Sequence, residues 1–315
     1  MNKGIIKFIL KLSVIFILAG SLIVYCEIRL RDIPNSYSVK KILFEKQLDS
    51  LQVLVLGNSQ PLYGIDPKYF DLKGFNLANS SQSLYYDKEI TLKYLDRMPK
   101  LKIVIIPVSY FSMWSDLYTA YEDWRDAFYL IWDVKSNNPH TFDIRRISYI
   151  ALYGPTYTQN LLKKNFSNVE VDNPADNGRG ICPPGYSFPL VDKSGKERVK
   201  VHDDMMHDDL LDKNIKYLKE FITSLKKRNI LPVLITTPVY KTYYDNMNPK
   251  KEEINEDVLN KLSKNFNIRY LNYLKDSRFD STDYANNDHL NDKGIEKYSK
   301  ILNEEIIKQT EMGKQ

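Results

Sequence analysis

Cysteine and blocks of like charge are what this sequence has least of. Its two cysteines, Cys26 and Cys182, lie far apart in a chain of 315 residues, which argues against a disulfide framework and against a zinc site built on cysteine. The formal net charge of +5 comes from Lys, Asp and Glu interleaved along the chain, without a dense block of Lys and Arg. A nucleic acid is therefore not an expected partner.

The sequence also lacks repeats and the composition of a disordered chain. Hydrophobic residues make up 43% and charged residues 27% of it, as in ordinary folded proteins. Its 315 residues leave room for one α/β domain with a sizeable core and a large insertion, or for two small domains.

The longest uncharged run lies near the N-terminus. Leu12–Cys26 carries no charge, and Ile5–Leu10 extends this run toward the ~20 residues that a spanning helix needs. Three lysines favour a cytoplasmic N-terminus: Lys3, Lys7 and Lys11. We therefore predict an uncleaved transmembrane anchor over residues 1–30. The alternative is a removable signal peptide, because Ala19-Gly20-Ser21 resembles a cleavage site.

Beyond this run the chain is expected to work outside the cytoplasm. Residues 31–50 are charged and are predicted to form a juxtamembrane stalk that is partly helical. From residue 51 to 310, short apolar runs typical of buried parallel strands alternate with helical patterns. The predicted strands are 53–56, 74–78, 102–108, 231–238 with its turn, and 268–271, and the predicted helices are 84–98, 208–228, 250–266 and 294–308. This alternation predicts a three-layer α/β domain with a doubly wound parallel sheet.

Residues 109–201 interrupt the alternation. Aromatic residues are dense in the first part, and Asn, Pro and Gly collect between Asn173 and Gly185. The segment is too long for a plain loop, so we interpret it as an insertion after the third strand that covers the sheet edge where a site would lie. Its aromatic side chains suit sugar rings, although filling a small core is their commoner role.

The first predicted strand runs into Gly57-Asn58-Ser59-Gln60, a turn that leads into a helix. Gly57 permits a tight turn, and Asn58 and Ser59 suit a helix cap. Ligands of open α/β sheets bind at this carboxyl edge, and helix N–H groups there favour an oxyanion. Ser59 is thus either a nucleophile or only a cap.

One of the four histidines, His289, lies in a loop that a doubly wound sheet returns to the edge carrying Ser59. An imidazole beside a serine hydroxyl can remove its proton and later return it to the leaving group. His202 and His207 also lie in an acidic stretch, but they are five positions apart and so do not share a helix face. No metal site is predicted there.

These residues together resemble a known family. Gly57-Asn58-Ser59 and the later Asp288-His289-Leu290-Asn291 are similar to the SGNH/GDSL hydrolase superfamily, in its membrane-anchored bacterial branches linked to surface-polysaccharide O-acylation. The resemblance covers residues 52–108 and 208–308. It implies a flavodoxin-like, SGNH-type domain, Ser59 as nucleophile and His289 as base, and no metal or organic cofactor. The family's aspartate falls on Asn286, so Asn286, Asp288 and Asp283 all remain candidates for the third triad member.

The resemblance also implies an oxyanion hole made of three donors. The family uses the N–H of the nucleophile, here Ser59, a glycine N–H after the second strand and an asparagine side chain after the third. That glycine is absent here, which leaves Asn79 or Ser81, and Ser109 stands where the asparagine is expected. Asn58 completes the candidate oxyanion and substrate-binding set. One missing donor would lower the rate by about 10²- to 10³-fold.

The prediction is an extracytoplasmic serine esterase or O-acyltransferase in the bacterial cytoplasmic membrane. It would act on acyl groups of a cell-surface polysaccharide, a substrate that only the resemblance supplies. Expected partners are the acylated glycan or an acyl donor, and a membrane acyltransferase. The alternatives are a non-catalytic SGNH-fold protein that binds or assembles glycans, and a partner subunit of a membrane acyltransferase.

Overall fold

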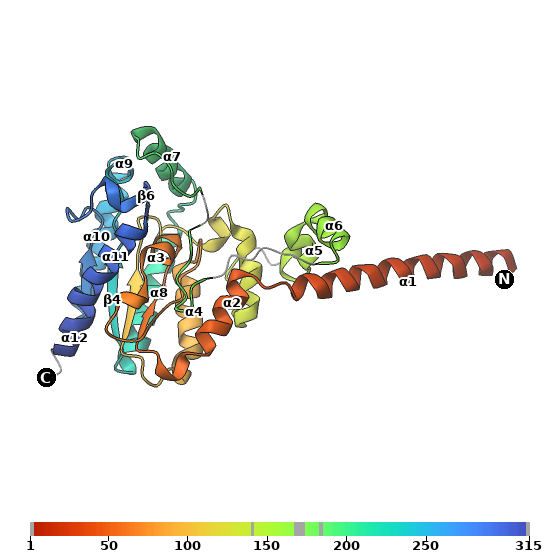
Figure 1. The fold of residues 1–315 in the computed structure, drawn as a ribbon, viewed down its shortest axis with the longest axis horizontal. Coiled ribbons are helices and arrows are strands. Elements are labelled where there is room, and N and C mark those ends of the chain that lie inside the picture. Colours follow the sequence, from red (N-terminus) through yellow and green to blue (C-terminus); the bar gives the residue numbers. More distant parts are fainter. Residues whose placement is uncertain (1–2, 140–141, 167–173, 183–184, 313–315) are drawn as a thin grey trace.

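A sheet of five parallel strands forms the centre of the protein. The computed structural model describes residues 3–139, 142–166, 174–182 and 185–312 (Figure 1). The strands are β1 (Val53–Val55), β2 (Gly74–Asn76), β3 (Ile103–Pro107), β4 (Leu231–Thr236) and β5 (Arg269–Asn272). They lie in the order β2-β1-β3-β4-β5, and each neighbouring pair is parallel. The predicted α/β class and parallel sheet are confirmed.

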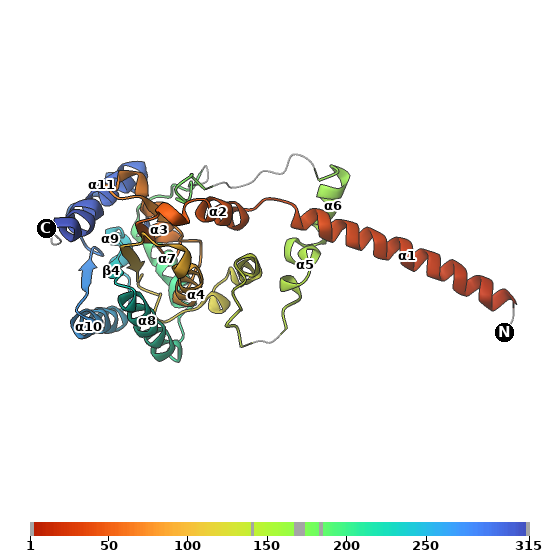
Figure 2. The same ribbon diagram turned by 90° about the horizontal axis from the view of Figure 1, so that it is seen from below.

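Helices cover both faces of this sheet (Figures 1 and 2). One face packs against α2 (Ser36–Glu45), α4 (Leu84–Tyr94), α8 (Leu210–Lys227) and α10 (Pro249–Phe266), and the other against α11 (Asp292–Leu302) and the π-helical segment η8 (Asn303–Lys308). Side chains alternate between the two cores, so that Val104 of β3 enters the first and Ile105 the second. Every residue of β1, β2 and β3 is buried, as expected of parallel strands covered on both faces.

The remaining helical turns are short. They are η1 (Leu48–Ser50), η2 (Pro67–Tyr69), η3 (Leu95–Arg97), η7 (Ser281–Asp283), α9 (Lys241–Tyr244) and α12 (Gln309–Met312). The helices predicted at 84–98, 208–228, 250–266 and 294–308 correspond to α4 with η3, α8, α10, and α11 with η8.

The strand order reverses next to β1, because β2 lies on one side of it and β3 on the other. In open α/β sheets a crevice for ligands opens at such a point, outside the carboxyl ends of the strands. Ser59 follows the carboxyl end of β1 after a short turn. The topology therefore places this serine where the fold has room for a ligand.

The described parts of residues 109–203 contain only short helical elements before a final helix. These are η4 (Leu117–Thr119), η5 (Asp123–Trp132), η6 (Ile144–Arg146), α5 (Tyr149–Tyr153), α6 (Pro155–Lys163) and α7 (Asp192–Asp203). Most of the aromatic side chains between residues 110 and 132 are buried, and Trp114, Phe128, Tyr129 and Trp132 belong to the main core. Tyr121 is the clear exception, with 66% of its surface exposed. Core filling is thus the main role of these aromatics.

The prediction of a stalk over residues 31–50 is wrong. Tyr37 and Phe44 of α2, two helical turns apart, are buried in the main core. Lys40 of the same helix is also buried, and its Nζ donates to the Ala78 carbonyl. The charged composition of this segment concealed one apolar face, and the segment belongs to the α/β domain.

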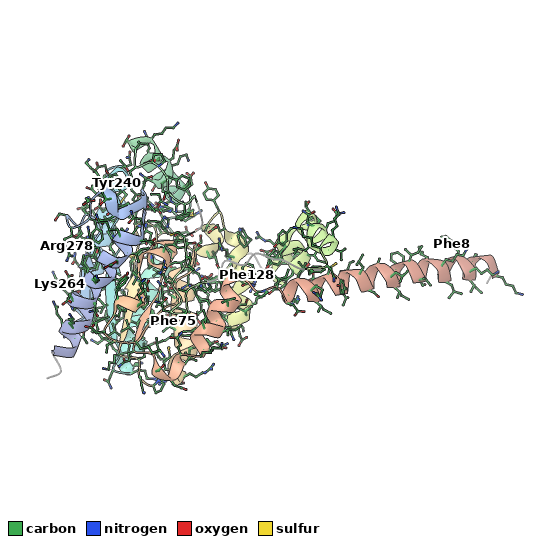
Figure 3. The ribbon with its side chains drawn as sticks, viewed as in Figure 1. Phe8, Phe75, Phe128, Tyr240, Lys264 and Arg278 are labelled. Carbon is green, nitrogen blue, oxygen red and sulfur yellow. The ribbon has the colours of Figure 1, made fainter. Side chains whose placement is uncertain are left out.

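The helix α1 (Lys3–Arg31) extends away from the domain (Figure 1). It is long and apolar enough to cross a membrane, and its most apolar window is not buried by other parts of the protein. Phe8, for example, points away from the helix in Figure 3, whereas Phe75 and Phe128 lie inside the domain. Helices of this length, composition and N-terminal position are either membrane anchors or signal sequences.

Candidate functional site

Ser59 is the first residue of α3 (Ser59–Gly64). The cap of this helix is Asn58, whose Oδ1 accepts the N–H of Gln60 at 3.0 Å. Gly57 precedes it with φ +108°, and a Cβ there would lie 2.8 Å from Pro61 Cγ, so the turn requires glycine. Because Asn58 performs the capping, the interpretation of Ser59 as only a helix cap is wrong.

His289 lies at the end of a small hairpin that the sequence patterns did not indicate. The hairpin consists of the antiparallel strands β6 (Tyr284–Asn286) and β7 (His289–Leu290). Its turn places the buried His289 ring beside α3, with Nε2 3.0 Å from Ser59 Oγ. The predicted approach of these two residues is confirmed, across 230 positions of sequence.

Asn286 orients the His289 ring. Its Oδ1 lies 3.0 Å from His289 Nδ1 and also accepts the N–H groups of Asp288 and His289, at 3.2 and 3.0 Å. Because this amide oxygen only accepts, Nδ1 carries the ring proton and Nε2 presents its lone pair to the Ser59 hydroxyl. A neutral asparagine therefore fixes the tautomer that a general base needs.

Asp288 places a negative charge next to the same ring. Its Oδ1 lies 3.2 Å from His289 Nδ1, and both carboxylate oxygens lie 3.0 Å from Arg198 Nε. Burial alone would raise the pKa of this carboxyl, but the Arg198 guanidinium and the His289 ring outweigh burial and hold the pKa well below its usual range. Asp288 is thus ionised at neutral pH.

Asp283 does not reach the ring. Its carboxylate is buried beneath α11, where Lys297 donates to it and the Asp280 N–H bonds to it at 2.9 Å. The candidates for the third triad member are thus reduced to Asn286 and Asp288. Asn286 orients the ring, and Asp288 supplies the negative charge beside it.

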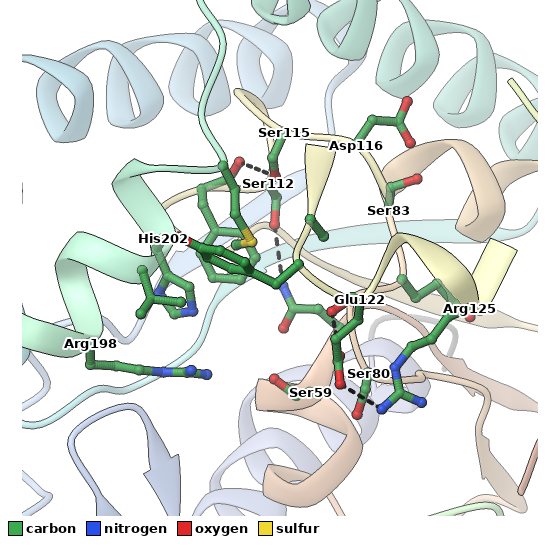
Figure 4. Close-up of a pocket in the computed structure, with 18 of the residues that line it drawn as sticks. Ser59, Ser80, Ser83, Ser112, Ser115, Asp116, Glu122, Arg125, Arg198 and His202 are labelled. Atoms are coloured by element: carbon green, nitrogen blue, oxygen red, sulfur yellow. Dashed lines mark hydrogen bonds and ion pairs between the residues drawn. The ribbon is translucent and has the colours of Figure 1, made fainter. Parts of the chain in front are cut away.

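A turn of serines lies next to Ser59 at the cavity (Figure 4). In this serine turn (Asn79–Gln82), the Gln82 N–H bonds to the Asn79 carbonyl at 3.2 Å, and Ser81 has the left-handed φ of 56°. Ser80 and Ser81 line the cavity, and no hydrogen bond engages their N–H groups within the described chain. The Ser59 N–H, at the first helical position, likewise has no carbonyl partner in α3.

The other predicted oxyanion residues differ in their access to the cavity. Ser109 is buried away from it, donating to Gln60 Oε1 at 2.7 Å and accepting from Asn58 Nδ2 at 2.9 Å. Asn79 supports the serine turn, since its N–H bonds to the Gly57 carbonyl at 3.0 Å. Asn58 does line the cavity, and its second amide hydrogen has only a 3.5 Å contact to Ser112 Oγ. Asn58 is therefore better placed as a side-chain donor than Ser109.

Two further groups of the site, Arg198 and His202, come from α7. The His202 ring packs on Phe111 at 4.2 Å, its Nδ1 contacts the Tyr243 hydroxyl, and its Nε2 lies 3.9 Å from Asp288 Oδ2. Burial, with help from Arg198, lowers the pKa of His202 to about 3, so this ring is neutral. The sequence did not place either residue at this site: Arg198 lies within the segment interpreted as an insertion, and His202, just after it, was considered only as a metal ligand.

Tyr186 closes the site over the His289 ring. Its hydroxyl lies 3.4 Å from both ring nitrogens, and its carbonyl accepts from Asn286 Nδ2 at 3.3 Å. Burial raises the pKa of Tyr186, so the phenol keeps its proton. Tyr63 packs against the same imidazole edge-on, with ring centroids 5.8 Å apart.

These groups surround a cavity of about 470 Å³ (Figure 4). Arg198 and His202 border it from α7, and Glu122 and Arg125 from the η5 side. Serine hydroxyls and aromatic rings form much of the remaining wall: Ser80, Ser81, Ser83, Ser112, Ser115, Tyr63, Phe111, Tyr121 and Tyr186. A second cavity of about 330 Å³ shares Tyr186 and Arg198 with the first and is bordered by His289.

No group of three or more His, Cys, Asp or Glu side chains in the described parts of the chain is placed to hold a metal ion. No protein-family model matches the sequence, and no curated protein matches it. The geometry of the site offers a serine hydroxyl and free N–H donors at the larger cavity, and an oriented imidazole that reaches Ser59 from the second, adjoining cavity.

Proposed function

We propose that the protein is a serine esterase or O-acyltransferase. The observation that carries this proposal is the chain of contacts from Ser59 Oγ through His289 to Asn286 and Asp288. An oriented histidine beside a serine, with a carboxylate behind it, is the arrangement that activates a serine hydroxyl in unrelated folds.

The reaction would proceed through an acyl-enzyme. Ser59 Oγ attacks the ester carbonyl as its proton passes to His289 Nε2, and the Asp288 carboxylate stabilises the imidazolium that results. The N–H groups of Ser59 and the serine turn stabilise the negative oxygen. His289 then gives its proton to the leaving alcohol, and water or a sugar hydroxyl takes the acyl group in the second half.

Three features support an SGNH-type domain with an insertion. The Gly-Asn-Ser turn ends β1, His289 lies just before the last large helix, and residues 109–201 separate β3 from α8 without adding a strand in their described parts. Asn58, whose amide borders the cavity, would take the role of the asparagine that the family carries after the third strand. The proposed site lies outside the cytoplasmic membrane of a bacterium, with α1 as a retained anchor.

An acylated surface polysaccharide is the proposed substrate. The wall of the larger cavity combines serine hydroxyls with aromatic faces, and both suit a sugar ring. A membrane acyltransferase that donates or receives the acyl group through contact with α1 is the proposed partner.

One observation favours a second candidate, a non-catalytic glycan-binding or assembly protein. Asp288 is held by Arg198 as well as by His289, and a carboxylate shared with a guanidinium supports an imidazolium less strongly. Under this alternative the cavity would bind a glycan without cleaving or transferring an ester.

Fluorophosphonate labelling of the purified full chain separates the two candidates. The esterase predicts rapid labelling that Ser59→Ala and His289→Ala abolish. Ser115→Ala is the matched control, because it removes a serine from the same cavity wall whose hydroxyl donates to the Phe111 carbonyl rather than contacting Asn58 or His289. Labelling of the wild type no faster than of Ser59→Ala would favour the non-catalytic alternative.

A further inference from the structure

Residues 147–166 contact the last turns of α1 through α5 and α6 (Figures 1 and 2), and η6, just before them, is paired with η5 through Arg145–Asp123 and Arg146–Asp126. Glu27 accepts hydrogen bonds from the Ser148 hydroxyl and from the N–H groups of Tyr149 and Ile150, and so caps the start of α5. Arg31 Nη2 donates to the Ile147 carbonyl at 2.8 Å. The contact is therefore specific and polar on one side.

An apolar cluster completes this attachment. Cys26 and Leu30 of α1 are buried against Leu161 and Phe166. The Tyr25 ring meets Phe166 edge-on at 5.9 Å. The attachment thus covers the helix from about Tyr25 onward, and leaves the preceding turns of α1 exposed.

The same segment presents large apolar side chains that the described parts of the chain leave uncovered. Phe142 is 74% exposed, Ile147 59%, Ile144 48% and Tyr157 40%. A single exposed apolar residue is ordinary on a protein surface. Here four belong to one segment that is bonded to α1, whose own apolar side chains remain exposed as far as Ile28.

The position along α1 indicates what this surface meets. A spanning helix uses about 20 residues for the ~30 Å hydrocarbon core. Counted from Ile5, this span ends near Val24, so that Tyr25–Arg31 would lie in the headgroup layer. Tyrosines are common at that depth, and the segment carries Tyr149, Tyr153 and Tyr157.

We propose that residues 142–166 form a second membrane contact, in which Phe142, Ile144, Ile147 and Tyr157 enter the interfacial layer of the outer leaflet beside α1. This rests on α1 being a retained anchor, as in the proposed function. The exposed Lys163 on the same segment favours anionic headgroups. Two contacts restrict the tilt of the domain more than one helix does, and so hold the catalytic cavity in a set orientation to the bilayer.

Tryptophan quenching in vesicles tests this contact. The full chain is reconstituted in phosphatidylcholine containing phosphatidylglycerol, either without brominated lipids or with lipids brominated near the headgroup, for Ile147→Trp and Ile254→Trp, or deep in the acyl chains, for Phe16→Trp. Ile147→Trp is compared with Phe16→Trp in α1 and with Ile254→Trp, an exposed position on α10 far from α1 in Figure 1. The wild type supplies the signal of the native tryptophans for subtraction.

Interfacial insertion predicts that the added fluorescence of Ile147→Trp is quenched at least about twofold more than that of Ile254→Trp. Equal quenching at these two positions, with Phe16→Trp quenched, would overturn the second contact, and a protein partner in the membrane would then be the candidate occupant. Absence of quenching at Phe16→Trp would overturn the anchor and this proposal with it. Ester hydrolysis in the same vesicles reports separately on the proposed chemistry.

Discussion

The two sides of Ser59 are built differently. On the base side, Asn286 Oδ1 accepts three N–H groups, and Asp288 is bonded by Arg198 as well as contacted by the ring. On the oxyanion side, the N–H groups of Ser59, Ser80 and Ser81 have no bonded partner within the described chain. A base must be oriented before the reaction starts, whereas oxyanion donors must stay available until the negative charge develops.

On the oxyanion side, two buried ionisable groups hold the turns that carry the N–H donors. Asp87 accepts the Gly57 N–H at 2.9 Å and the Gln82 side-chain amide at 2.6 Å, and so joins the Gly57 turn to the serine turn. Lys40 bonds to the Ala78 carbonyl just before the serine turn. Burial raises the pKa of Asp87 to about 7 and lowers the pKa of Lys40 to about 7. Burial therefore disfavours charge in this support, whereas the base side holds the ionised Asp288 next to the ring.

The largest effect on kcat is expected from the nucleophile and the base themselves. Ser59→Ala and His289→Ala should each lower kcat for a chromogenic acetyl ester by about 10⁴- to 10⁶-fold, because nucleophile and base act as one unit. The double variant should lose little more than either single variant. Steady-state rates of the two single variants and the double variant check this. If the two single reductions in kcat multiply in the double variant, Ser59 and His289 do not act together.

The oxyanion side is tested by Asn58→Asp. This change keeps the Oδ1 that caps α3 and removes the amide hydrogen that borders the cavity. We expect kcat to fall by about 10²- to 10³-fold with little change in KM, since the lost donor acts on the transition state. Circular dichroism controls for folding. An unchanged kcat would show that the Asn58 amide is not an oxyanion donor and that only backbone N–H groups form the oxyanion hole.

The division of labour on the base side is tested by Asp288→Asn. Asn286 continues to fix the ring tautomer, so kcat should fall by about 10- to 100-fold, less than the ~10⁴-fold expected when the tautomer is lost. Asn286→Leu should be the more severe variant. If Asp288→Asn instead reduces kcat as much as Asn286→Leu, the carboxylate also orients the ring.

Asp87→Asn tests the support beneath the oxyanion side through the pH dependence of stability. The folded protein keeps the Asp87 proton up to about pH 7, whereas the unfolded chain loses it near its ordinary 3.8. The folded state therefore binds more protons between these values, and its stability falls as pH rises through this window. Asn has no such loss, so the variant should be more stable than wild type by up to ~4 kcal/mol above pH 7, shrinking below pH 4. Unfolding midpoints across this range measure it, and a constant difference would contradict the buried proton.

The smallest effect is expected from Ser109→Ala. Ser109 does not reach the cavity, so kcat should stay within about threefold of wild type, while stability falls by ~1 kcal/mol through the lost hydrogen bonds. Comparison with Asn58→Asp in one assay sharpens the contrast between the two residues. A fall of 10²-fold or more in Ser109→Ala would restore it as an oxyanion donor.

The parts predictable from sequence were those governed by local pattern. The buried strand runs predicted the parallel sheet, and the return of the His289 loop to the edge carrying Ser59 followed from that topology. By contrast, the packing of α2 in the core was missed, although a partly helical segment was predicted there, because Tyr37 and Phe44 are the apolar exceptions in a charged segment. Arg198 and His202 were missed because contacts between α7 and the β6–β7 hairpin join distant segments, and no local spacing encodes them.

The oxyanion donors show the same limit. A sequence motif assigns a donor to a position after a strand, and here that assignment led to Ser109. The structure instead places the side-chain amide of Asn58 at the cavity. One hydrogen of this amide bonds to Ser109 Oγ, and this bond fixes the position of the amide. Packing decides which of the two side chains reaches the cavity, and the position of a residue in the sequence does not reveal this packing.

The central claim, that Ser59 is a nucleophile activated by His289, is tested most directly by trapping the acyl-enzyme. The full chain is mixed with excess acetyl ester, quenched in acid within one turnover, and its intact mass and peptides are measured. The account predicts one added acetyl group, located on Ser59, and none in His289→Ala. Turnover without an adduct on Ser59, or an adduct on another residue, would contradict it.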